Sequence, residues 1–143
     1  MNSERRRFLV AAAAIAAATA NVGAQAAPAK VLVEVWKSPT CGCCKDWMRH
    51  MEAHGFQVRA HDTGNTAMRQ RMKIPFELGS CHTAVVGRYA IEGHVPAKDV
   101  LRLIKERPDA IGLTVPGMPV GSPGMDGPEY GERRDPYDVL LVR

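Results

Sequence analysis

The sequence predicts one small α/β domain, a central sheet with helices on its faces. The chain has 143 residues, enough for one domain, and 45% of them are apolar, enough for a packed core. Short β-branched runs alternate with segments of helical periodicity. The net charge is only +4 and three arginines occupy positions 5–7, while 6% of residues are aromatic. This composition argues against a nucleic-acid-binding surface.

The first half of the mature chain is expected to fold as strand, helix, strand. Residues 31–36 form a β-branched run typical of a buried strand, and residues 37–42 carry turn residues. A helix is predicted from about Cys43 to His54, followed by a strand over residues 56–60. The apolar stripe of that helix has the spacing i, i+3, i+4, i+7 and consists of Cys44, Trp47, Met48 and Met51.

The second half continues with a short helix, a hairpin and a third helix. The short helix carries Met68 and Met72 and ends before Pro75, with Thr63 or Asn65 as its N-cap. Residues 83–86 and 89–91 are predicted as two strands joined tightly at residues 87–88. The third helix has proline 96 in its first turn, ends before proline 108, and bears Val100, Leu101 and Ile104.

The C-terminal part has a different composition. Residues 112–136 are rich in Pro and Gly, and the tripeptide Pro-Gly-Met occurs at 116–118 and again at 123–125. A flexible linker is one interpretation; an ordered lid over the domain is the other, since methionines are unusual in linkers. Residues 137–142 are predicted to form an extra strand.

The N-terminal residues 1–26 have the organisation of an export signal. Three arginines at 5–7 precede an apolar stretch over 8–20, and Ala-Gln-Ala at 24–26 is a small-residue cleavage site. Both the twin-arginine and the Sec route fit, and an N-terminal membrane anchor is the alternative. We therefore expect a periplasmic protein whose residues 27–143 form a single domain in an oxidising compartment.

The four cysteines are the main functional feature. Cys41, Cys43 and Cys44 lie between a predicted strand and helix, where the helix N-terminus favours thiolates. Cys81 precedes a strand expected to bring it to the same end of the sheet. Three sulfurs so arranged suit a cluster of several ions with bridging thiolates, or a disulfide plus a spare thiol. In two alternatives the cysteines have only a structural role. These are a pair of disulfides, Cys41–Cys44 and Cys43–Cys81, and a structural zinc site.

Residues 36–45 (WKSPTCGCCK) resemble the signature of the CopG-type periplasmic copper-resistance proteins. This is a thioredoxin-like family long catalogued as a domain of unknown function. The likeness continues through residues 80–84, 91–96 and 115–125 and covers the chain from about residue 31 to its end. The resemblance implies a thioredoxin-like fold, copper held as a multi-copper thiolate cluster, and a role in copper resistance. It also implies interconversion of Cu(I) and Cu(II), with other periplasmic copper-handling proteins as partners.

The candidate metal ligands combine thiolates with imidazole and thioether groups, because Cu(I) prefers soft donors. They are Cys41, Cys43, Cys44, Cys81, His82, Met118 and Met125. His82 follows Cys81 directly, and successive residues of a regular strand face opposite sides, so we expect only one of the two to point inward. His94 is expected to bond to backbone near a helix start, and His50 and His54 to face solvent.

Three functions are compatible with these residues. The first is a copper-resistance protein that holds Cu(I) in the cysteine cluster. The second is a metal-free thiol–disulfide oxidoreductase in which Cys41 is the nucleophile and Cys44 the resolving thiol. The third is a non-enzymatic copper carrier or store.

Overall fold

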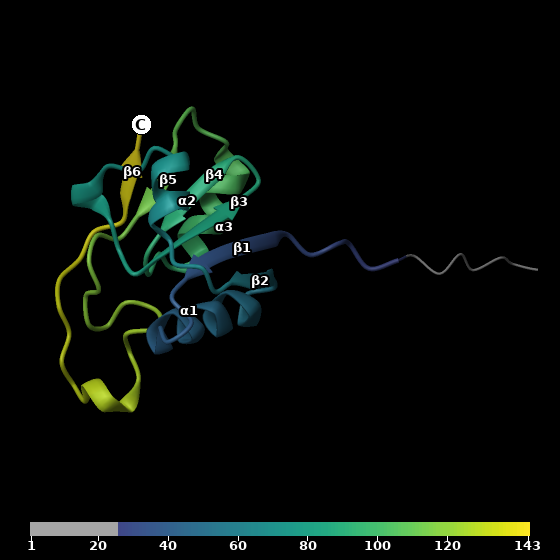
Figure 1. The fold of residues 1–143 in the computed structure, drawn as a ribbon. Helices are drawn as coiled ribbons and strands as arrows, with labels where there is room; N and C mark the ends of the chain where they lie inside the picture. The colour runs from purple at the N-terminus through teal and green to yellow at the C-terminus, as the bar shows by residue number, and fades with distance from the viewer. Residues whose placement is uncertain (1–25) are drawn as a thin grey trace, which may run out of the picture.

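The computed structural model describes residues 26–143, which form a six-stranded mixed sheet in the order β2-β1-β3-β4-β5-β6 (Figure 1). Thus the predicted α/β class is confirmed. The predicted export signal lies outside the described residues, apart from Ala26. The strands are β1 (Leu32–Lys37), β2 (Gln57–His61), β3 (His82–Val86), β4 (Tyr89–Glu92), β5 (Gly112–Thr114) and β6 (Leu140–Val142).

Three α-helices and two short 3₁₀ helices complete the described part of the chain. The α-helices are α1 (Gly42–Ala53), α2 (Thr66–Arg71) and α3 (Ala97–Glu106), and the 3₁₀ helices are η1 (Phe76–Leu78) and η2 (Pro128–Tyr130). The predicted helices therefore form within a few residues of their expected bounds. Over residues 26–143, none of the helices has both the length and the apolar character that crossing a bilayer requires.

The sheet brings the start of α1 and the start of β3 together. β1 pairs in parallel with β2 and antiparallel with β3, and β3 and β4 form the predicted hairpin around residues 87–88. In the β1–β3 pair, Lys37 lies opposite His82. The end of β1, which leads into α1, is therefore next to the residues that precede β3.

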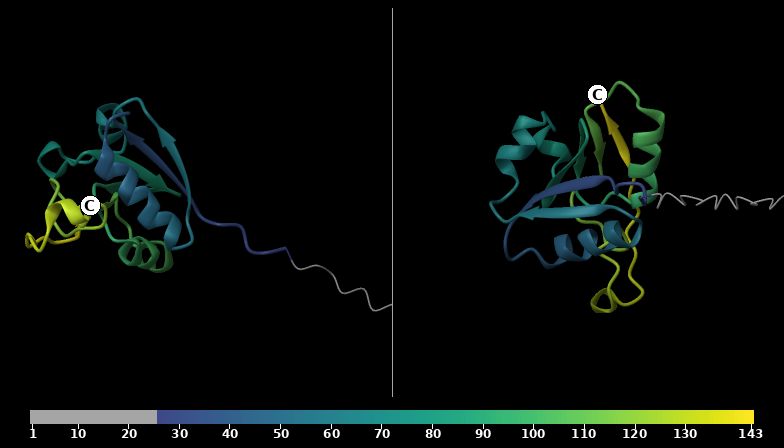
Figure 2. Two further views of the ribbon diagram at one scale, coloured as in Figure 1. Left: turned by 90° about the horizontal axis from the view of Figure 1, so that it is seen from below. Right: turned by 90° about the vertical axis from the view of Figure 1, so that its right-hand side faces the viewer.

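Both faces of the sheet are covered (Figure 2). The main core lies between the sheet and helices α1 and α3, with Trp47 and Met51 from α1 and Val100 and Leu103 from α3. A smaller cluster on the other face packs Ile74, Ala90 and Val142 together with Met72 and Leu78. The alternation along β4 supports this division, because Tyr89 and Ile91 belong to the first cluster and Ala90 to the second.

Three details differ from the sequence-based expectation. Residues 112–114, assigned to the Pro/Gly-rich segment, form β5 between β4 and β6, and the predicted strand over 137–142 is shortened to β6. A Cβ at Gly112 would lie 1.8 Å from the Ala90 carbonyl oxygen, so the close strand approach here requires glycine. On α3, Leu103 is buried, whereas Leu101 is 46% exposed.

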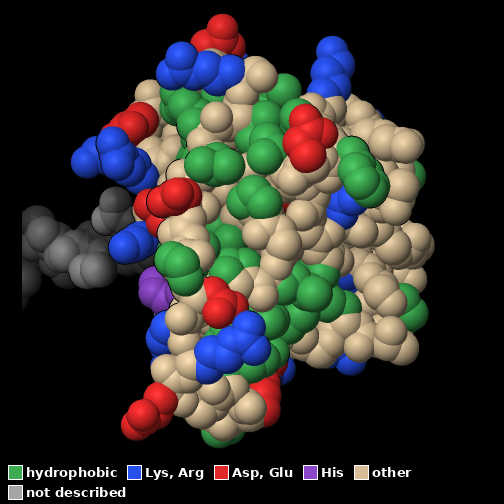
Figure 3. Space-filling view, turned by 90° about the vertical axis from the view of Figure 1, so that its left-hand side faces the viewer, with side chains coloured by type: hydrophobic (Ala, Val, Ile, Leu, Met, Phe, Trp, Pro, Cys, Tyr) green, Lys and Arg blue, Asp and Glu red, His purple; other side chains and the backbone are tan. Residues whose placement is uncertain are grey.

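Residues 115–136, called the lid segment below, follow an ordered path past the start of α1 and back to β6 (Figure 1). Val120 N–H donates to Asp135 Oδ2 at 2.9 Å, and Asp135 N–H donates to the Val120 carbonyl at 2.8 Å. Gly124, at φ +85°, packs against the α1 backbone. These bonds and contacts tie the lid segment to itself and to α1. Figure 3 shows hydrophobic side chains scattered among polar atoms on one face of the molecule.

Candidate metal centre

Three of the cysteines are placed by the start of α1. Cys41 is the N-cap residue, its N–H donates to the Ser38 carbonyl at 3.2 Å, and Cys43 and Cys44 lie in the first turn. Cys41 and Cys44 form a disulfide, whereas Cys43 and Cys81 are free thiols. The structure thus holds a disulfide plus spare thiols, and the second disulfide of the two-disulfide alternative is not formed.

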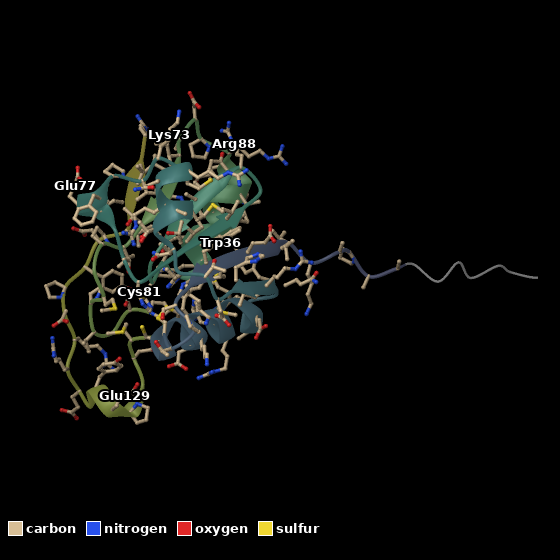
Figure 4. The ribbon with its side chains drawn as sticks, viewed as in Figure 1. Trp36, Lys73, Glu77, Cys81, Arg88 and Glu129 are labelled. Carbon is tan, nitrogen blue, oxygen red and sulfur yellow. A yellow bond between two sulfur atoms is a disulfide. The ribbon has the colours of Figure 1, made fainter. Side chains whose placement is uncertain are left out.

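The fourth cysteine, Cys81, comes from the segment before β3 and lies with the three cysteines of the α1 start, as the sequence predicted. Figure 4 labels Cys81. All four sulfur atoms lie within 4.8 Å of one another. The Cys81 Sγ is 3.5 Å from the Cys44 Sγ and 3.9 Å from the Cys43 Sγ. The antiparallel pairing of β3 with β1 explains the encounter, because it places Cys81 next to the β1–α1 turn.

His94 lies directly against Cys81. Its Nε2 atom is 3.1 Å from the Cys81 Sγ, and its Nδ1 atom is 2.8 Å from the Pro123 carbonyl of the lid segment. Since a carbonyl oxygen only accepts hydrogen bonds, Nδ1 carries the proton, and the Nε2 lone pair faces the sulfur. A carbonyl that holds one imidazole nitrogen in this way is a common partner of a metal-binding histidine.

His82 also faces this end of the sheet, contrary to the expectation that only one of Cys81 and His82 would point inward. Its Nδ1 atom is 3.5 Å from the Cys81 Sγ, and Cys81, His82 and His94 each offer a ligand atom within 4.8 Å of the others. The alternation argument fails because β3 begins at His82, so Cys81 lies in the preceding bend. The His82 side chain is fully buried, and its Nε2 atom has no hydrogen-bond partner.

Burial controls the protonation of this group. Burial, followed by the charge of Cys43, raises the pKa of the Cys81 thiol to about 12. Burial likewise lowers the pKa of His94, and it lowers the pKa of His82 well below its usual value, with the neighbouring His94 as the next cause. The metal-free group is therefore a neutral thiol between two neutral imidazoles, and a metal that binds Cys81 displaces its proton.

Comparison with known proteins identifies the family. Two solved structures titled "Copper resistance protein copG", Form 1 and Form 2, are each 46% identical to this chain and have TM-scores of 0.72. Each match covers 79% of this chain, and 89% and 88% of the Form 2 and Form 1 chains respectively. The chain belongs to the CopG family. A family described as "Protein of unknown function, DUF411" matches residues 78–125, and a search of curated proteins finds no match.

Two methionines of this CopG-family chain were expected near the cysteines. Met125 is 7% exposed, and its sulfur accepts a hydrogen bond from the Tyr130 hydroxyl at 3.3 Å. Gly124, the residue before Met125, packs against the Cys43 carbonyl oxygen, so Met125 follows directly the point where the lid segment contacts the start of α1. Met118 is 51% exposed, and its place as a ligand stays a prediction.

His54 is exposed as expected, whereas the expectation that His50 faces solvent is wrong, because His50 is half-buried and bonds to the start of α3. The His50 Nε2 atom accepts the Ala97 N–H at 3.0 Å. His94 does bond to backbone, as expected, but its second nitrogen faces Cys81. A signal was present in the sequence: counting outward from the two-residue turn at 87–88 places Cys81 opposite His94.

Proposed function

We propose that this protein is an exported, periplasmic copper-binding protein of copper resistance, which holds Cu(I) in the group formed by its four cysteines. The convergence of four sulfur atoms within 4.8 Å carries the proposal. The family supports it, since the similar solved structures are titled as copper resistance proteins. The export signal over residues 1–26 and a single mature domain over residues 27–143 are part of this proposal.

The donor set fits Cu(I) better than a hard cation. Thiolates and neutral imidazoles are soft or borderline ligands, and the described group contains no carboxylate. The buried His82 supports the fit through its Nδ1 atom, which lies 3.5 Å from the Cys81 Sγ and offers a neutral imidazole nitrogen to the group. While Cys41 and Cys44 are bonded to each other, the ligands that remain available are Cys43, Cys81 and His94.

Reduction of the disulfide would add Cys41 and Cys44 to the ligand set. Four thiolates so close together favour several Cu(I) ions with shared, bridging sulfurs over a single ion. Met125, buried beside Tyr130, is the better-placed of the two thioethers, and Met118 is a candidate at the exposed rim. Interconversion of Cu(I) and Cu(II) is the enzymatic form of this proposal, and a carrier or store is its non-enzymatic form.

The Cys41–Cys44 disulfide favours a second candidate function, a metal-free thiol–disulfide oxidoreductase. Cys41 is partly exposed at the helix N-terminus, where a thiolate is stabilised, and Cys44 is fully buried, as a resolving thiol is. This function predicts turnover of a model disulfide by metal-free protein and loss of turnover in Cys41→Ser.

Anaerobic titration of the reduced full chain with Cu(I), followed by sulfur X-ray absorption, tests the first proposal. We expect tight binding against a Cu(I) chelator and a copper–thiolate signal, both weakened in Cys43→Ser and Cys81→Ser. His54→Gln, which alters an exposed histidine on α1, is the matched control and should bind like the wild type. Binding of less than one copper per chain, or an absent copper–sulfur signal, would contradict the proposal.

A further inference from the structure

A buried carboxylate lies next to the metal centre without belonging to its ligands. The side chain of Glu92, the last residue of β4, is fully buried. Its Oε1 atom accepts hydrogen bonds from Arg69 Nε at 2.8 Å and from the Ser80 N–H at 2.7 Å. Its Oε2 atom accepts a bond from the Thr83 hydroxyl at 2.5 Å. Both carboxylate oxygens are therefore satisfied within the protein.

The same network holds the other side of Ser80. The Ser80 carbonyl accepts hydrogen bonds from Arg69 Nη2 and, at 3.2 Å, from Asn65 Nδ2. Asn65 Nδ2 also lies 3.3 Å from the Thr83 Oγ1. The Arg69 guanidinium thus spans the Glu92 carboxylate and the Ser80 carbonyl. The N–H and the C=O of one residue are both held by side chains from α2, its cap and β4.

Close packing confines Ser80 as well. Gly93 has φ +73°, and a Cβ there would lie 2.5 Å from the Ser80 Cβ and 2.7 Å from the Val115 carbonyl oxygen. The Ser80 hydroxyl donates to the Gly117 carbonyl of the lid segment. Ser80 therefore contacts the end of β4 and the lid segment in addition to the polar network.

This arrangement matters because Ser80 precedes Cys81, and neither residue belongs to a strand. The cysteines of α1 are positioned by helical hydrogen bonds, whereas Cys81 lies in a bend outside the sheet ladder. A buried ion pair contributes little net stability on average, since desolvation offsets much of the attraction. The Arg69–Glu92 pair bonds both backbone groups of Ser80, the residue before Cys81.

We infer that Arg69 and Glu92 are positioning residues for the metal centre, which fix Ser80 so that the Cys81 sulfur faces Cys43, Cys44 and His94. The inference deepens the proposed function and rests on it. Neither side chain touches the metal. Groups that orient a metal ligand typically change metal affinity by about 10- to 100-fold when they are altered, and we expect losses in this range.

The experiment compares Cu(I) affinities of reduced full-chain variants by anaerobic competition with a chromogenic chelator. Glu92→Gln removes the charge, and Arg69→Lys keeps the charge but loses the planar fork that spans two acceptors. The matched controls make the same changes in an exposed ion pair on α3, in which Arg102 Nε lies 2.7 Å from Glu106 Oε1. These control variants are Arg102→Lys and Glu106→Gln. We expect unchanged affinity in the controls.

A purely structural role is separated by repeating Glu92→Gln in a Cys81→Ser background. If the pair acts through Cys81, the loss of about 10- to 100-fold should shrink to less than about threefold there. An equal loss in both backgrounds, or no loss in either, overturns the inference. Where Glu92→Gln does not fold, Asn65→Ala is the milder variant, since it removes only the amide bonds to Ser80 and Thr83.

A second measurement decides the inference independently of copper. In the reduced metal-free chain, Glu92→Gln should raise the rate of Cys81 alkylation relative to that of Cys43, measured by mass spectrometry of the two peptides. An unchanged ratio overturns the inference. If the wild type does not bind Cu(I), the proposed function fails, and the alkylation ratio still shows whether the pair positions Cys81.

Discussion

Substitution of Gly124 by alanine should loosen the lid segment from α1. Gly124 has φ +85°, a conformation that L-residues other than glycine adopt at a cost of about 1–2 kcal/mol. A Cβ at this position would also lie 2.7 Å from both the Cys43 carbonyl oxygen and the Trp47 nitrogen. Both contacts are with helix backbone, so neither can be relieved by rotating a side chain.

The expected cost combines backbone strain with overpacking. Overpacking of a well-packed site typically costs about 1–3 kcal/mol, so Gly124→Ala should lower the free energy of unfolding by about 2–5 kcal/mol in total. Gly117→Ala is the matched control in the same segment. Its φ is +70°, but a Cβ there would meet nothing within 4 Å, so only the strain of about 1–2 kcal/mol applies.

Urea denaturation of both variants, followed by tryptophan fluorescence, measures the difference. We expect Gly124→Ala to be less stable than Gly117→Ala by about 1–3 kcal/mol. It should also bind Cu(I) less tightly, because Pro123, the residue before Gly124, holds the His94 ring. Equal stabilities of the two variants would refute the reasoning, since they would show that the lid segment does not press against α1.

Three further predictions concern protonation and the histidine ligand. Burial raises the pKa of Cys81 to about 12, so its alkylation should stay slow near pH 8 and accelerate only towards pH 12; fast labelling at neutral pH would contradict this. The lowered pKa values of His82 and His94 mean that the unfolded chain binds more protons below its histidine pKa of 6.5. The free energy of unfolding should therefore fall as the pH drops below 6.5, which urea titrations at about pH 7.5 and about pH 5 would detect; a flat profile would count against burial of neutral imidazoles. His94→Gln should weaken Cu(I) binding by about tenfold or more, with His54→Gln unchanged, and equal affinities would exclude His94 as a ligand.

Local patterns in the sequence predicted most of the fold. The i, i+3, i+4, i+7 stripe located α1, and the two-residue turn at 87–88 located the β3–β4 hairpin. β5 was missed because three residues are too few to show alternation, and one of them is glycine. Its place in the sheet follows from long-range packing, in which Gly112 approaches Ala90 more closely than any other residue allows.

The candidate metal centre was predictable to a similar extent. The spacing of Cys41, Cys43 and Cys44 at a strand–helix junction indicated the cluster, and the strand order brought Cys81 to it. The inward position of His82 could not be read from alternation, because the bend before β3 is set by the network around Glu92. That network joins side chains from α2 and β4, which no local pattern relates.

The register of the β3–β4 hairpin determines how Cys81 and His94 lie relative to each other. Insertion or deletion of a single residue between them would change the register of the hairpin and move Cys81 away from its place opposite His94. Relatives that keep this centre should therefore preserve the chain length from 81 to 94. The length of the chain around η2 can vary among these relatives, because the η2 helix contains no buried residue.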